Sequence, residues 1–202
     1  MKKLLTGLLV LVGLAGGVQA DGDPQAGKKM AAACQACHGP GGSEPIQDSY
    51  PKIADLGENY LFKQLKAIQS GERNIALMAG QLDGMSGQDL RDLAAYFNQQ
   101  ETSAGEADPE LVDEGEALYR GGNLSKNVAA CLACHGPQGK GNEPAGYPRL
   151  SGQNSDYVAQ ALKAYKSGER VYDEQSGIMG DIASRLSESE MEAVGEYIEG
   201  LH

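Results

Sequence analysis

The strongest constraint on this chain is a nine-residue stretch that it contains twice. "CQACHGPGG" spans residues 34–42 and "CLACHGPQG" spans residues 131–139, so the second copy follows the first by 97 positions. The two stretches hold all four cysteines of the chain and two of its three histidines. We therefore expect the chemistry of the protein at these two places.

The duplication extends well beyond the cysteine motifs. "LKAIQSGER" from Leu65 matches "LKAYKSGER" from Leu162 at the same offset, and later segments match at an offset of 101, which implies four extra residues in the second copy. A long internal repeat indicates repeated structural units. The sequence predicts an N-terminal domain over residues 21–100, a linker of polar composition over 101–112, and a homologous C-terminal domain over 113–202.

Each copy is predicted to be helical, which makes the fold class all-α. Leu61, Leu65 and Ile68 recur at helical spacing, and the second copy repeats this pattern. Residues 86–89 and 187–190 have the composition of capping boxes that begin the last helix of each copy. Sustained strand alternation is absent. Two domains of this size, with two Phe and no Trp between them, have thin cores that a large apolar group would complete.

The first twenty residues are typical of a cleaved secretory signal. A basic start at Lys2 and Lys3 precedes an apolar run from Leu4 to Val18, and small residues lead to a predicted cleavage after Ala20. The apolar run is shorter than the ~20 residues of a membrane-spanning helix, which disfavours an uncleaved anchor. We expect an exported protein of the periplasm.

The charge of the exported chain excludes several partners. Loss of Lys2 and Lys3 leaves 15 of the 17 basic residues against 28 acidic ones, a net charge of −13. The phosphates of nucleic acids and anionic lipids would repel such a chain, so we expect no nucleic acid partner. A protein partner with a basic docking face fits this charge better. We expect the chain itself to be a monomer.

Covalent haem is the interpretation that the C-x-x-C-H motifs favour. A disulfide does not require a histidine after the second cysteine in both copies. Zinc requires four ligands for each site, whereas each copy offers two cysteines and one histidine. A redox-active C-x-x-C belongs to a βαβ pattern, which is absent from this sequence. C-x-x-C-H is the attachment signature of c-type haem. The predicted attachment residues are Cys34 and Cys37 for one haem c and Cys131 and Cys134 for the second, with His38 and His135 as the proximal iron ligands.

The repeat also selects a sixth ligand for each iron. Only His202 remains among the histidines, so methionine is the alternative. Met78 and Met179 occupy equivalent positions, whereas Met85 and Met191 have leucine as their counterparts. We expect Met78 and Met179 in loops before the last helix of each copy, as the sixth ligands. His/Met coordination raises the reduction potential of a haem and leaves no open position on the iron.

Taken together, the sequence resembles the dihaem cytochrome c4 family. The resemblance covers residues 21–202 and rests on the two C-x-x-C-H motifs, the later methionines, "YPKIADLGENYLFKQLKAIQSGER", "AAYF" and the ending "YIEGLH". It implies two class I cytochrome c domains in tandem, related by a pseudo-twofold axis. It also implies carbonyls of Pro51 and Pro148 that accept the proximal histidine N–H groups. Arg73 and Arg170 are either partners of haem propionates or solvated charges at helix ends.

The function that this resemblance implies is electron transport, and not enzymatic catalysis. Members carry electrons in the periplasm from a cytochrome bc-type complex towards a terminal haem-copper oxidase. Attachment to the membrane surface stays open. The alternatives are the dihaem subunit of a flavocytochrome sulfide dehydrogenase and a dihaem enzyme such as a peroxidase. An enzyme would need an exchangeable axial ligand, which the predicted His/Met pairs do not supply.

Overall fold

The computed structural model describes residues 21–202, so the predicted signal peptide lies outside the described residues. Regular structure in this range consists of helices, short 3-10 turns and two isolated β-bridges, without a strand, which confirms the all-α prediction. Between residues 21 and 202, no helix is long and apolar enough to cross a membrane. The α-helices are α1 (Pro24–Met30), α2 (Ala32–His38), α3 (Glu58–Ser70), α4 (Gly87–Asn98), α5 (Val112–Gly121), α6 (Leu132–His135), α7 (Ser155–Ser167), α8 (Glu174–Ser184) and α9 (Glu188–Gly200).

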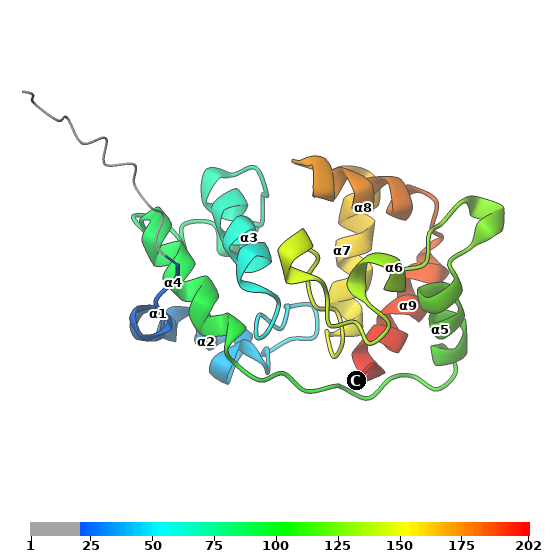
Figure 1. Ribbon diagram of the computed structural model, residues 1–202, viewed down its shortest axis with the longest axis horizontal. Coiled ribbons are helices and arrows are strands. Elements are labelled where there is room, and N and C mark those ends of the chain that lie inside the picture. The colour runs from blue at the N-terminus through cyan, green and yellow to red at the C-terminus, as the bar shows by residue number, and fades with distance from the viewer. Residues whose placement is uncertain (1–20) are drawn as a thin grey trace, which may run out of the picture.

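The helices form two lobes that correspond to the two copies of the repeat. Figure 1 shows α1 to α4 in one lobe and α5 to α9 in the other, with an extended segment running from α4 to α5. Each lobe has its own buried core, in which the apolar residues of the repeat meet. These residues include Leu61, Leu65, Leu90, Leu93 and Phe97 in the first lobe, and Val158, Leu162, Met191, Val194 and Ile198 in the second.

The ends of the equivalent helices are built alike. Ser86 and Ser187 cap α4 and α9, and in each case the carboxylate three residues later accepts the cap's own backbone N–H. Both predicted capping boxes are therefore present. Helices α3 and α7 end at Gly71 and Gly168, whose φ angles of +81° and +86° are left-handed conformations that favour glycine.

A glycine allows the first helix of each domain to cross its last helix closely. A Cβ atom on Gly27 of α1 would lie 2.0 Å from the backbone oxygen of Asp92 in α4. The same atom on Gly115 of α5 would lie 2.1 Å from the backbone oxygen of Ala193 in α9. Both separations are too short for any side chain, so these two crossings require glycine.

The two domains differ most where the second copy has four more residues. The first has only the 3-10 turn η2 (Ala76–Met78), whereas the second forms α8, which is capped by Asp173 and Ser176. The expectation of a loop at Met179 is therefore wrong, since this residue lies within α8. The extra residues and the cap explain the difference, because they supply the length and the N-terminal hydrogen bonds that a helix needs.

The domains pack against each other through polar contacts. Arg149 Nη1 lies 2.7 Å from Asp55 Oδ2, and Glu143 accepts the backbone N–H of Glu58 at the start of α3. The connecting segment is also attached, since Lys52 Nζ donates to the Ser103 carbonyl at 2.9 Å. These contacts support a packed pair of domains rather than two domains on a flexible tether.

Candidate functional site

Each C-x-x-C-H motif lies on a short helix. Cys34, Cys37 and His38 belong to α2, while Cys131 is the N-cap of α6, which carries the other two residues of its motif. The spacing of three places both cysteines of a motif on one face of a helical turn. No disulfide joins any of the four cysteines within residues 21–202.

The environment of these thiols does not fit a redox-active pair. Burial raises the pKa of the Cys131 thiol to about 11, and burial also raises the pKa of Cys34. Reactive C-x-x-C thiols instead have a lowered pKa. Residues 21–202 also contain no cluster of three His, Cys, Asp or Glu side chains that could hold a metal ion by themselves.

Both motif histidines are held in the same way by a proline carbonyl. His38 Nδ1 lies 2.9 Å from the Pro51 oxygen, and His135 Nδ1 lies 2.9 Å from the Pro148 oxygen. Burial lowers the pKa of both imidazoles, and the bonds to the carbonyls oppose this effect. A neutral imidazole that donates from Nδ1 keeps Nε2 as the nitrogen that can bind a metal.

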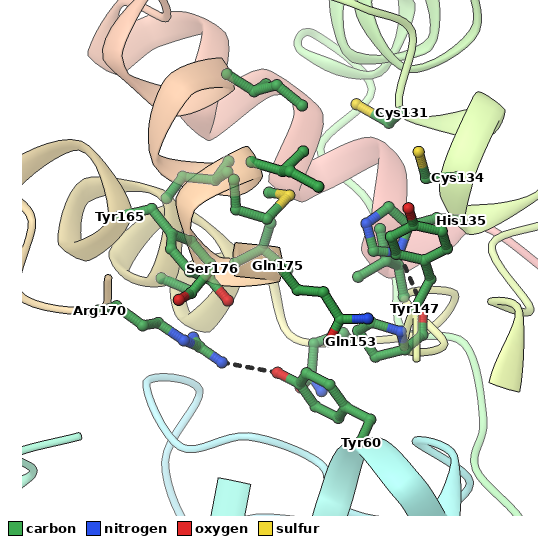
Figure 2. A pocket seen from close by; sticks show the side chains of 18 of the residues that line it. Tyr60, Cys131, Cys134, His135, Tyr147, Gln153, Tyr165, Arg170, Gln175 and Ser176 are labelled. Atoms are coloured by element: carbon green, nitrogen blue, oxygen red, sulfur yellow. Dashed lines mark hydrogen bonds between the residues drawn. The ribbon is translucent and has the colours of Figure 1, made fainter. Parts of the chain in front are cut away.

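A deep apolar pocket lies beside the second motif. It contains about 1400 Å³ of space between protein atoms, including the part that opens to solvent, and Met179 lines it together with His135. Figure 2 shows Cys131, Cys134 and His135 on one side of this pocket, with Tyr165 and Arg170 across from them. The second motif and its predicted methionine are therefore brought to one cavity.

The arrangement in the N-terminal domain is less complete. Met78 is half-buried in η2, next to Leu77, whose side chain is 71% exposed. Met85 packs against the N-terminal core, and Met78 is not among the side chains that do so. The structure thus places Met179 with its histidine, while the pairing of Met78 with His38 depends on the repeat.

Two tyrosines that sequence reasoning missed lie between the domains with the two arginines. Arg170 is 5% exposed and donates to Tyr60 at 2.8 Å, and both Arg170 and Arg73 donate to Tyr157. Burial alone would raise the pKa of Tyr157, but the two arginines outweigh it and lower that pKa to about 8. Tyr60 and Tyr157 are separated by 97 positions, so the repeat contained the signal that could have found them.

These surroundings fit a large flat apolar group with an anionic edge. Apolar side chains from α7, α8 and α9 line the pocket, and they include Val158, Leu162 and Ile198. Arg170 Nε is buried and has no hydrogen-bond partner among the described residues, which an anionic group at the pocket's edge would satisfy. Haem has this combination of a broad apolar face and two carboxylates, so the pocket fits it.

Two helical domains, each with a C-x-x-C-H helix and a histidine held by a proline carbonyl, define a dihaem c-type cytochrome. Comparison with known proteins agrees, because residues 24–101 and 112–202 match the family Cytochrome c. A cytochrome c4 of Azotobacter vinelandii is 46% identical over 100% of both chains. The crystal structure of reduced recombinant cytochrome c4 from Pseudomonas stutzeri is 43% identical, with a TM-score of 0.86 over 90% of this chain and 100% of that chain.

The chain belongs to the cytochrome c4 family. It is an electron-transfer cytochrome with two covalently bound haem c groups. A further relative is named thiosulfate dehydrogenase electron acceptor, from Thiomonas intermedia; it is 35% identical over 83% of this chain and 78% of its own length.

Proposed function

We propose that this protein carries electrons in the periplasm from a quinol-oxidising cytochrome bc-type complex to a terminal haem-copper oxidase. Residues 21–100 and 113–202 each hold one haem, and residues 101–112 link them. The net charge of −13 after loss of the signal peptide supports docking to basic faces of redox proteins. The same charge argues against nucleic acid as a partner.

We assign the attachment and ligation of the haems to repeated residues. Cys34 and Cys37 attach the first haem and Cys131 and Cys134 the second, with His38 and Met78 as the ligands of one iron and His135 and Met179 as the ligands of the other. When bound, the haem iron supplies one-electron exchange between its ferric and ferrous states.

The observation that carries this assignment is the 2.9 Å contact between a histidine Nδ1 and a proline carbonyl in both domains. This contact fixes the orientation of the ring and raises its basicity as a ligand. Pro51 and Pro148 therefore position the ligands, and the apolar pocket excludes water around the group that they hold.

Carbon monoxide binding tests the ligation, because a ferrous iron with two protein ligands has no free position. We expect the parent protein to bind carbon monoxide slowly and in less than stoichiometric amount at neutral pH. Met78→Ala and Met179→Ala should each open one iron to rapid binding. Met85→Ala is the matched control, since Met85 packs in the N-terminal core, and it should open neither.

Two results would contradict the assignment. Rapid binding of carbon monoxide by the parent protein would favour a dihaem enzyme such as a peroxidase. An opened site in Met85→Ala with none in Met78→Ala would move the first ligand from Met78 to Met85.

A second candidate function follows from the Thiomonas intermedia relative, whose name describes an electron acceptor of thiosulfate dehydrogenase. The two functions differ in the donor, so they separate in a reduction assay. Faster reduction of the protein by thiosulfate and a thiosulfate dehydrogenase than by quinol and a bc complex would favour the second. A stable complex with a flavoprotein would instead support the flavocytochrome subunit.

A further inference from the structure

A glutamine of the C-terminal domain is hydrogen-bonded to the residue that follows Pro51. The Lys52 N–H donates to Gln153 Oε1 at 2.8 Å, and Gln153 Nε2 donates to the Lys52 carbonyl at 2.8 Å. The neighbouring Pro51 carbonyl is the acceptor for His38 Nδ1. The histidine of the N-terminal domain and the glutamine of the other domain are thus joined by one short backbone segment.

The connection passes through a single peptide group. The carbonyl of Pro51 and the N–H of Lys52 belong to the same planar amide, whose atoms share their electrons by resonance. When the N–H donates a hydrogen bond, the carbonyl becomes a stronger acceptor. Gln153 Oε1 therefore strengthens the bond that the Pro51 carbonyl accepts from His38, and a stronger bond at Nδ1 makes the imidazole a more basic ligand.

The hydrogen bonds between Gln153 and Lys52 are shielded from solvent. Gln153 is 5% exposed and Lys52 is 8% exposed, so water does not compete for the two bonds between them. Gln153 also lines the pocket of the C-terminal domain, and Figure 2 shows it at the edge of that pocket near Tyr60. The residue lies where the two domains meet.

The N-terminal domain does not offer an equivalent hydrogen bond to the segment around Pro148. At the repeat offset of 97, Gln153 corresponds to Leu56, a buried apolar side chain of the N-terminal core that has no amide to offer. In the C-terminal domain, the residue before Pro148 is held by its own domain, because Asn142 and Tyr147 form a β-bridge. The N-terminal domain has Pro45 in place of Asn142, and proline has no N–H to donate.

A side chain of the C-terminal domain supplies the donor that Pro45 lacks. Tyr50, the counterpart of Tyr147, has its carbonyl bonded to Asn154 Nδ2 at 3.0 Å. The segment that holds His38 is therefore completed by the C-terminal domain on both sides of Pro51. The equivalent segment around Pro148 is completed by its own domain on the Tyr147 side.

We propose that Gln153 is a positioning residue for the N-terminal haem, acting on His38 through the Pro51–Lys52 peptide group. Through it, packing of the domains lowers the reduction potential of that haem, because a more basic histidine favours the ferric state. The inference rests on the proposed ligation of iron by His38.

Gln153→Met tests this proposal, since methionine has a similar length and cannot accept the Lys52 N–H. In the haem-loaded protein we expect the equilibrium at the N-terminal haem to shift towards the ferrous state by about two- to threefold, which is about 18 to 28 mV at about 59 mV for each tenfold change. The C-terminal haem should shift less. The His38 Nδ1–H resonance should move in the proton NMR spectrum of the ferrous protein, and that of His135 should not.

Two further variants separate this effect from a loosened interface. Asn154→Ala removes a hydrogen bond between the domains but leaves the Pro51–Lys52 peptide group intact, so it should leave the N-terminal potential near its parent value. Gln153→Glu keeps an oxygen that accepts the Lys52 N–H, and it should not raise that potential.

An unchanged His38 resonance in Gln153→Met would overturn the proposal. Equal shifts in Gln153→Met and Asn154→Ala would also overturn it, because both would then report only weaker packing. A rise in Gln153→Glu would exclude the acceptor role. Failure of the ligation itself would appear separately, as rapid carbon monoxide binding by the parent protein.

Discussion

Glu190 is the carboxylate whose removal has the clearest consequence for stability. It is the third residue of α9, and it accepts the backbone N–H of its N-cap Ser187 at 2.8 Å. It also accepts from Lys126 Nζ at 2.7 Å and from Asn123 Nδ2 at 3.0 Å. Glu190→Gln retains the shape of this side chain and removes its charge, so it isolates the contribution of the carboxylate.

The size of the effect follows from the pKa of Glu190. Burial would raise this pKa, but the bonds from Lys126, Ser187 and Asn123 outweigh burial and lower it to about 2. The ordinary value of ~4.3 lies about 2 units higher, which corresponds to ~3 kcal/mol as an upper limit. The Lys126 side chain is 41% exposed, so solvent screening reduces the expected loss in Glu190→Gln to about 1 to 2 kcal/mol.

The sign of the pH dependence is fixed by the lowered pKa. A carboxylate whose pKa is lower in the folded state stabilises the protein fully above its unfolded pKa. That stabilisation is lost as the pH falls from about 4.3 towards about 2. The parent protein should therefore exceed Glu190→Gln in stability at pH 7, and the two should converge near pH 2.

Guanidinium unfolding of the haem-loaded proteins, followed by circular dichroism between pH 7 and pH 2, measures this difference. Asp89→Asn is the matched control, because Asp89 occupies the same place in the exposed capping box of α4 and has no basic partner within residues 21–202. It should destabilise less than Glu190→Gln. A loss in Glu190→Gln that stays the same at every pH would refute the reasoning, since the charge would then contribute nothing.

Three further predictions concern packing, cofactor content and internal electron transfer. Gly115→Ala should destabilise the protein by about 1 to 3 kcal/mol in thermal unfolding, because its Cβ would meet the Ala193 carbonyl. Gly121→Ala in the same helix is the control: its Cβ would lie in open space, so the stability should change by no more than about 0.5 kcal/mol. Denaturing mass spectrometry should give the mass of the chain from Asp21 plus two haems, and the mass of the bare chain would contradict the two attachment motifs. After a reducing pulse, the haems should equilibrate at a rate independent of protein concentration; a rate that rises in proportion to concentration would show transfer between molecules only.

Local patterns predicted the parts of the structure that repeat. Helical spacing located α3 and α7, and the capping boxes at residues 86–89 and 187–190 located the starts of α4 and α9. These signals are reliable because each depends on residues within one or two turns of the same helix. The glycines at the α1–α4 and α5–α9 crossings were not predicted, since their requirement comes from a partner helix distant in sequence.

In the candidate site too, some residues could be predicted from the sequence and others could not. The cysteines and histidines of the motifs were evident from their spacing, and Tyr60 and Tyr157 were accessible through the repeat. Gln153 was not accessible, because its counterpart is a leucine and its partner across the interface, Lys52, is 101 residues away. A repeat identifies what two copies share, whereas an interface between copies depends on where they differ.

Sequence differences between the two copies at their interface allow one duplicated unit to form two haem sites with different surroundings. The motif, the proline and the predicted methionine are the same in both copies, so these residues alone would give similar potentials. At the interface, each copy packs against the other copy rather than facing solvent. A substitution there can therefore change the surroundings of one site without altering its ligands. Gln153 of the C-terminal copy accepts the Lys52 N–H across the interface, and its counterpart Leu56 in the N-terminal copy has no such acceptor. Interface residues of this kind can therefore separate two potentials while the attachment chemistry of both haems stays unchanged.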